Sequence, residues 1–102
     1  AKVIVKEVSN HPTFQFRAIP EIRKCVDTSN LTYLYEESSE SWFCKSKVLN
    51  DLIVASNTKV VANYDADAIL PVQSYFDAYK LIDENHADVV YPYQCGVYQW
   101  KV

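Results

Sequence analysis

The stretch KVVANYDADAILP spans residues 59–71, and it decides the predicted fold. Its first half, Lys59–Tyr64, is apolar and does not alternate cleanly, which predicts a strand buried on both faces of a parallel sheet. Asp65 and Asp67 come directly after this strand. Residues i and i+2 of an extended chain point the same way, so both carboxylates would face one ligand. Crowded carboxylates need a compensating charge, and the pattern therefore indicates a divalent cation with a phosphate ligand.

The elements predicted on either side of this stretch alternate between strands and helices. Strands are expected at 3–8, 31–35 and 89–91, a short extended piece at 14–17, and helices at 19–26, 42–55 and 71–84. An acidic, serine-rich loop is expected over residues 36–41. The alternation predicts an α/β fold in three layers, with an open, mostly parallel sheet flanked by helices. At 102 residues, the chain is expected to form a single domain over 1–102.

Composition excludes several classes of protein. A hydrophobic content of 49% with 23% charged residues is typical of a globular domain. The net charge of -3, with no cluster of Lys or Arg, argues against nucleic acid as a partner. One glycine in the whole chain excludes the glycine-rich phosphate loops. No apolar run is long enough to cross a bilayer and no signal-peptide core is seen, so we expect no membrane span and a cytoplasmic location.

The three cysteines are Cys25, Cys44 and Cys95. Their number is odd, they are widely spaced and no two form a Cys-x-x-Cys pair, so neither a disulfide framework nor a zinc site is indicated. We expect reduced and mostly buried thiols.

A second signal lies in FCKSKVLN, residues 43–50, near the start of a predicted helix. Lys45 and Lys47 would add two positive charges to the amide donors of a helix N-terminus, which suits a diphosphate. Alternatives remain open for both signals: the lysines could be solvated surface residues, and Asp65 and Asp67 could serve a helix cap and a turn.

Taken in order, these segments resemble the GT-A glycosyltransferases. The order is YEE at 35–37, FCKSKVLN at 43–50, DADAILP at 65–71 and DVVYPY at 88–93. It is similar to the nucleotide-sugar-binding half of the β-1,4-galactosyltransferase and chondroitin-polymerase-like (family 2-like) branch, over residues 31–99. The resemblance implies a GT-A-like nucleotide-diphospho-sugar transferase fold, minimal or truncated, that binds a UDP-sugar and transfers its glycosyl group to an unknown saccharide acceptor with inversion.

The resemblance also implies a metal site. Asp67 would ligate Mn²⁺ or Mg²⁺ directly, and Asp65 would hold the ribose or a metal-bound water. The cation would bridge the diphosphate and stabilise the leaving nucleoside diphosphate as a Lewis acid.

Further residues match positions that bind the nucleotide in the family. Lys45 stands where galactosyltransferases often carry Arg, so it would attract phosphate as a point charge without a bidentate fork. Phe43 would line the uracil side, or belong to the core. Lys47 would contact phosphate or fix the helix, and Glu36 or Glu37 would approach the base or ribose.

Departures from the family leave two other functions open. The family continues into an acceptor half with a Trp-Gly-Gly-Glu-Asp-like segment and the catalytic base, and neither occurs in residues 1–102, so the catalytic residues are unknown. The main alternative is a non-catalytic nucleotide-sugar-binding or interaction module. A haloacid-dehalogenase-type phosphatase is disfavoured, because Ile69 stands where that family has Thr or Val. Aromatic segments at 91–93 and 98–100 either complete the core or form the surface of a homodimer.

Overall fold

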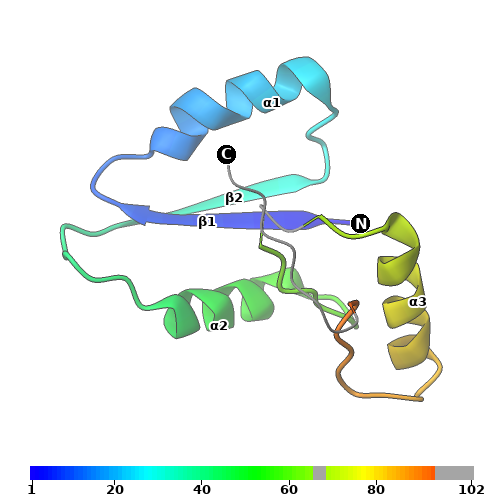
Figure 1. The fold of residues 1–102 in the computed structure, drawn as a ribbon. Coiled ribbons are helices and arrows are strands. Elements are labelled where there is room, and N and C mark those ends of the chain that lie inside the picture. The colour runs from blue at the N-terminus through cyan, green and yellow to red at the C-terminus, as the bar shows by residue number, and fades with distance from the viewer. Residues whose placement is uncertain (66–68, 94–102) are drawn as a thin grey trace, which may run out of the picture. The chain divides into compact units, whose positions relative to one another are not determined.

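The structure, a computed structural model, describes residues 1–65 and 69–93 and confirms the α/β class (Figure 1). Its elements are β1 (Val3–Ser9), the π-helical segment η1 (Phe14–Ala18), α1 (Ile19–Cys25), β2 (Leu31–Glu37), α2 (Lys45–Ser56) and α3 (Val72–Asp83). The chain divides into two compact units, Ala1–Asn57 and Thr58–Val102, and each is described by itself. One domain over 1–102 stays a prediction.

The sheet of the first unit consists of β1 and β2, which run parallel. They pair along their whole lengths, from Val3 opposite Leu31 to Ser9 opposite Glu37. Parallel strands require a crossover connection, and the helical segment formed by η1 and α1 provides it. Both strands therefore end at the same edge of the sheet, which is the edge where open α/β folds bind their ligands.

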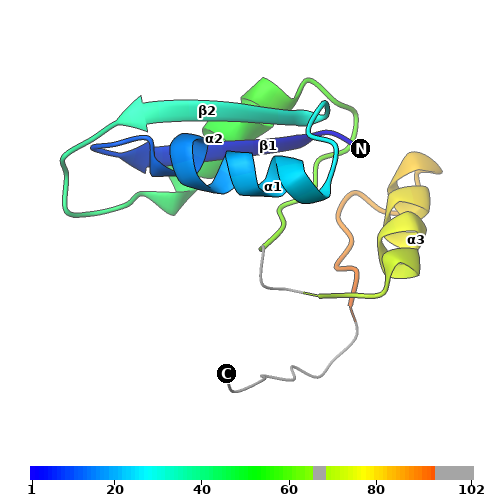
Figure 2. The same ribbon diagram turned by 90° about the horizontal axis from the view of Figure 1, so that it is seen from above.

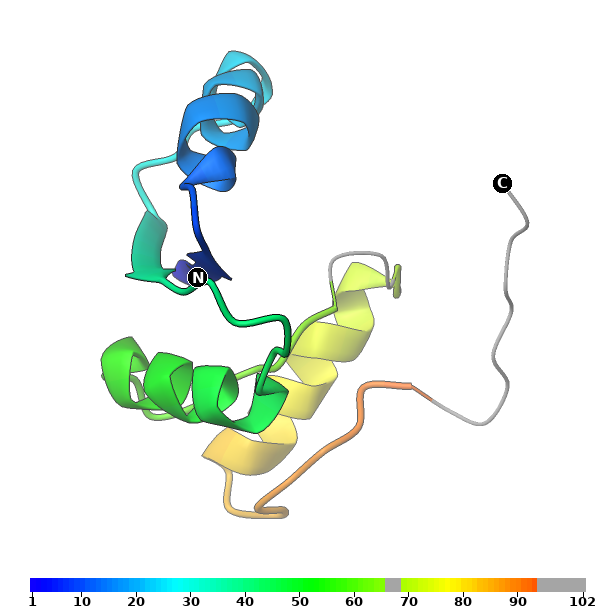
Figure 3. The ribbon, with the colours of Figure 1, turned by 90° about the vertical axis from the view of Figure 1, so that its left-hand side faces the viewer.

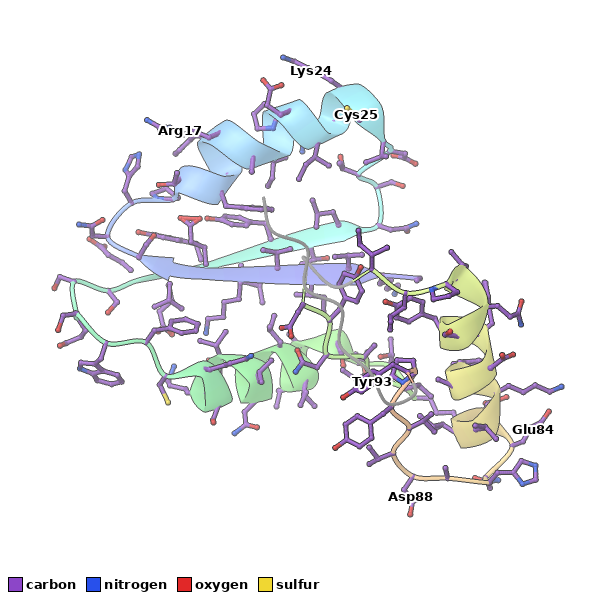
Figure 4. The ribbon with its side chains drawn as sticks, in the orientation of Figure 1. Arg17, Lys24, Cys25, Glu84, Asp88 and Tyr93 are labelled. Carbon is purple, nitrogen blue, oxygen red and sulfur yellow. The ribbon has the colours of Figure 1, made fainter. Side chains whose placement is uncertain are left out.

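Helices cover both faces of this two-stranded sheet. Helix α1 lies on one face and α2 on the other, as Figures 1 and 3 show, and Figure 2 looks down on α1 lying over the strands. Among the described residues, the buried apolar side chains are Ile19 of α1, 7% exposed, and Val48 of α2, 8% exposed. The side of the helical layer away from the sheet carries Arg17 of η1 and Lys24 of α1 (Figure 4). The first unit thus has the predicted three layers around a thin core.

The extended piece predicted at 14–17 is wrong, because these residues form the helical segment η1, which runs into α1. The cause is Glu7 of β1, whose carboxylate accepts hydrogen bonds from the backbone N–H groups of Thr13 and Phe14, each at 2.7 Å. A carboxylate at a helix start satisfies orphan donors and complements the helix dipole. Pro20 lies in the first turn of α1, as predicted.

The strands predicted at 59–64 and 89–91 are also wrong, because neither segment forms a strand. After α2, Asn57 adopts a left-handed conformation, with φ of 47°, and the Thr58 hydroxyl then donates to the Val60 carbonyl at 3.0 Å. Such a local side-chain bond favours a turn over a ladder. Both segments are largely exposed: Val61 is 45% exposed and Val89 74%.

The helices predicted at 19–26, 42–55 and 71–84 are confirmed as α1, α2 and α3. None of them, within the described part of the chain, is long and apolar enough to span a membrane. Cys25, labelled in Figure 4, and Cys44 are exposed, so the expectation of buried thiols is wrong for both. Cys95 lies outside the described residues.

We predict that Glu7→Gln lowers the stability of the first unit. A carboxamide offers one acceptor oxygen where the carboxylate offers two, so one of the two bonded N–H groups loses its partner. We expect the melting temperature at pH 7 to fall by roughly 5 °C. Circular dichroism at increasing temperature measures it, and Glu21→Gln, in an exposed pair with Lys24, is the matched control with little effect.

The loss of melting temperature caused by Glu7→Gln should depend on pH. Partial burial opposes ionisation of Glu7, but hydrogen bonds from Phe14, Ser9 and Thr13 outweigh it and hold the pKa below its ordinary value. The stabilisation is therefore complete above the ordinary Glu pKa and is lost as the pH falls through the lower folded-state pKa. The two proteins should converge in melting temperature in that acidic range. A difference that persists unchanged there would contradict the role given to the charge.

Candidate functional site

A hollow of about 320 Å³ opens at the carboxyl ends of the two parallel strands. It is lined by the end of β1 and by the loop between β2 and α2. The lining residues are Val8, Ser9, Asn10, Ser38, Ser39, Glu40, Ser41, Trp42 and Phe43. Of the sequence-predicted residues, Phe43 lines it, and its side chain is 60% exposed. The hollow is rich in hydroxyl groups and has two aromatic side chains in its wall.

The last residue of β1, Ser9, organises the floor of this hollow. Its carbonyl accepts hydrogen bonds from the Ser38 N–H at 2.9 Å and from the Tyr35 hydroxyl at 2.8 Å. Its hydroxyl oxygen lies 2.6 Å from the His11 carbonyl and 3.0 Å from Glu7 Oε1. These bonds join the two strand ends just beyond the last ladder pair, so the two loops that form the hollow start from fixed positions.

A charge cluster of Lys6, Glu36, Lys47 and Asp51 lies between the sheet and α2. Lys6 Nζ is 2.6 Å from Asp51 Oδ2 and 3.3 Å from Glu36 Oε1. Lys47 Nζ is 3.2 Å from Glu36 Oε1 and 3.3 Å from Asp51 Oδ2. The Lys6 side chain is 9% exposed and that of Lys47 58%. Two cations and two anions thus balance one another, with the partly buried ammonium of Lys6 bonded to both anions.

The cluster shifts the pKa values of its members toward the charged forms. The hydrogen bond to Asp51 raises the pKa of Lys6, against the opposing effect of burial, and the hydrogen bond to Glu36 raises that of Lys47. The bonds from Lys47 and Lys6 lower the pKa of Glu36. All four groups are therefore ionised near neutral pH. The charge of Lys47 is compensated within the protein, which weakens its attraction for an added phosphate.

Lys45 is the first residue of α2 and is exposed. It lies two residues after Phe43, the last of the residues that line the hollow, and is not itself one of them. In the described structure no side chain caps α2 at Cys44. The roles of Phe43, Lys45, Lys47 and Glu36 toward a nucleotide stay predictions.

The two aspartates of the predicted metal site are in the second unit. Asp65 is exposed, and it follows no strand because residues 59–64 form none. Asp67 lies outside the described residues, so its pairing with Asp65 stays a prediction, but the strand expected at 59–64, whose end was to carry both carboxylates, does not form. Carboxylate oxygens suit Mn²⁺ or Mg²⁺, and Mg²⁺ in phosphate sites commonly takes only one or two carboxylates from the protein. Over residues 1–65 and 69–93, no three His, Cys, Asp or Glu side chains group as metal ligands.

The aromatic segments that raised the question of a homodimer are described in part. Tyr91 is 72% exposed and Tyr93 59%, with ring centroids 5.8 Å apart. Residues 98–100 lie outside the described part of the chain. A homodimer stays a prediction.

Sequence reasoning missed several residues of the hollow and of the charge cluster. Trp42 was assigned to the helix predicted at 42–55, but α2 begins at Lys45 and leaves Trp42 in the loop. Lys6 and Asp51 are 45 residues apart and carry no local pattern. Lys6, within a strand rich in β-branched residues, was the one available signal, because an ammonium shielded from water needs an anion.

The chain was compared with protein-family models, with curated proteins and with solved structures, and none of the three comparisons gives a match.

We predict that the two lysines of the charge cluster differ in their effect on stability. Lys6→Met leaves Asp51 and Glu36 without their least exposed partner and should lower the melting temperature by roughly 5–10 °C. Lys47→Met removes an exposed partner and should lower it by no more than about 2 °C. Thermal unfolding of both variants measures the difference. Equal losses would contradict the central place given to Lys6.

Proposed function

We propose that the chain is a GT-A-like domain that binds a UDP-sugar through a divalent cation and takes part in glycosyl transfer. The supporting observation is the hollow at the carboxyl edge of the parallel strands, with Phe43 in its wall and Lys45 at the adjoining helix start. Two of the four segments that resemble the family lie at this edge: Glu36 and Glu37 end β2, and FCKSKVLN, residues 43–50, includes the start of α2. Their place supports the nucleotide part of the proposal.

Lys45 of the first unit and a cation held by the second unit are each proposed as a group that binds phosphate. Lys45 supplies a point charge at the start of α2, where the helix dipole also favours an anion. Asp67 and Asp65 would hold Mn²⁺ or Mg²⁺, which when bound supplies Lewis-acid stabilisation of the leaving nucleoside diphosphate. Two carboxylates and a diphosphate form a donor set of hard oxygens that both cations accept.

Glycosyl transfer further requires a catalytic base and an acceptor site, and residues 1–102 offer no assignment for either. A domain that binds but does not react would be the interaction module described above. Release of free sugar from UDP-galactose or UDP-glucose separates the two functions, since a transferase commonly hydrolyses its donor slowly in the absence of acceptor. Binding without any release would favour the module.

Our first prediction for this function concerns the metal. UDP should bind in the presence of Mn²⁺, and Asp67→Ala should weaken that binding at least about 10-fold, because a direct metal ligand is lost. Isothermal titration calorimetry with and without Mn²⁺ measures this. Asp77→Ala, which removes an exposed carboxylate bonded to Gln73 on α3, is the matched control and should bind normally. Equal affinity for UDP with and without Mn²⁺ would refute the proposal.

The second prediction separates the two lysines near the start of α2. Lys45→Ala should weaken UDP binding several-fold, because it removes a positive charge at the start of α2, where the helix dipole also favours an anion. Lys47→Ala should have little effect, because the ammonium of Lys47 lies 3.2 Å from Glu36 and 3.3 Å from Asp51. The same titrations measure both variants. A larger loss for Lys47→Ala would show that the charge cluster opens to receive the ligand.

A further inference from the structure

Trp42 and Phe43 are adjacent aromatic residues in the loop between β2 and α2. Their side chains are 67% and 60% exposed, although both line the hollow at the strand ends. Packed aromatic side chains bury roughly 150–250 Å² each, so leaving both in water forgoes considerable hydrophobic stabilisation. A pair of exposed aromatic residues beside a hollow is an arrangement that a ligand can cover.

The chemistry of the hollow restricts the kind of ligand group it accepts. Hydroxyl groups of Ser39 and Ser41 and the amide of Asn10 both donate and accept hydrogen bonds. Glu40 is the one charged residue among the described lining residues, and none of them is Lys or Arg. The hollow therefore disfavours a phosphate and suits an uncharged ring that has flat apolar faces and a polar edge.

We propose that Trp42 is a specificity-determining residue that stacks on the nucleobase of the bound nucleotide. A nucleobase is uncharged, flat on both faces and polar at its edge, which matches the aromatic wall and the hydroxyl-rich lining. The lining ends at Phe43, and α2 begins two residues later at Lys45, so the charged part of the same ligand would leave the hollow toward the start of α2. The assignment deepens the proposed function and rests on it for the identity of the nucleotide.

Fluorescence tests the contact directly, because the chain has two tryptophans, and Trp100→Phe leaves Trp42 as the sole one. Uridine, titrated without metal, should quench this emission with a saturable curve, since stacking needs neither phosphate nor cation. Ribose and galactose at the same concentrations should leave it unchanged. Quenching by galactose but not uridine would reassign the wall to a saccharide and overturn the proposal, and so would the absence of any response to uridine.

Affinity measurements test whether the contact contributes to binding. For UDP with Mn²⁺, Trp42→Ala should weaken binding about 10-fold, and Trp42→Phe should retain most of the affinity because a ring remains. Phe16→Ala is the matched control, since Phe16 is an aromatic residue of the same unit, 63% exposed and outside the hollow lining. Circular dichroism should show that all three variants keep the fold, because the substituted side chains are mostly exposed.

The outcomes distinguish this inference from the proposed function. If UDP binds with Mn²⁺ but Trp42→Ala binds as tightly as the unchanged protein, the role of Trp42 is refuted and the proposed function stands. If uridine quenches the Trp42 emission while the affinity for UDP is the same with and without Mn²⁺, the stacking role is supported and the metal-dependent function is refuted.

Discussion

Two adjacent charged residues in β1, Lys6 and Glu7, hold the helical layers of the first unit against the sheet. Consecutive strand residues point to opposite faces. Lys6 reaches Asp51 of α2 on one face at 2.6 Å, and Glu7 accepts from Phe14 N–H at the start of η1 on the other at 2.7 Å. Few apolar side chains of the described residues are buried, and hydrophobic contacts do not fix an orientation. Charge-assisted hydrogen bonds are directional. These two contacts therefore determine where the helices lie.

The parts of the fold that the sequence predicts are those with a local periodic signal. Helix α2 follows from its apolar spacing and α1 from Ile19, Ile22 and Pro20, while β1 and β2 follow from β-branched and alternating residues. The segment 59–64 has equally good strand composition, yet composition does not specify a partner, and a strand exists only when its backbone pairs. The helical segment η1 was not predicted, because the carboxylate that stabilises it lies on another element. This carboxylate is that of Glu7 in β1, seven residues away from Phe14.

The residues of the candidate site likewise fall into those that the sequence predicts and those that it does not. Phe43 was predicted from the family resemblance and Lys45 from its place near a helix start; Phe43 lines the hollow and Lys45 is the first residue of α2, while their roles toward a ligand stay predictions. Trp42 was missed because periodicity places a helix boundary only to within a few residues, and three residues decide here between a helix surface and the wall of a hollow. That Glu36 compensates Lys47 was not predictable, since it depends on how α2 packs on β2.

The balance of charge at this edge decides which kind of ligand group each part of it favours. Inside the charge cluster, Lys6 and Lys47 are matched by Glu36 and Asp51, so this region presents little net charge to a ligand. The hollow itself carries hydroxyl groups, aromatic rings and a carboxylate, which discourages an anion from entering it. Lys45 begins α2, where the helix dipole also favours an anion. Under the proposed function, the neutral ring of a nucleotide would therefore lie in the hollow and its phosphates toward the start of α2.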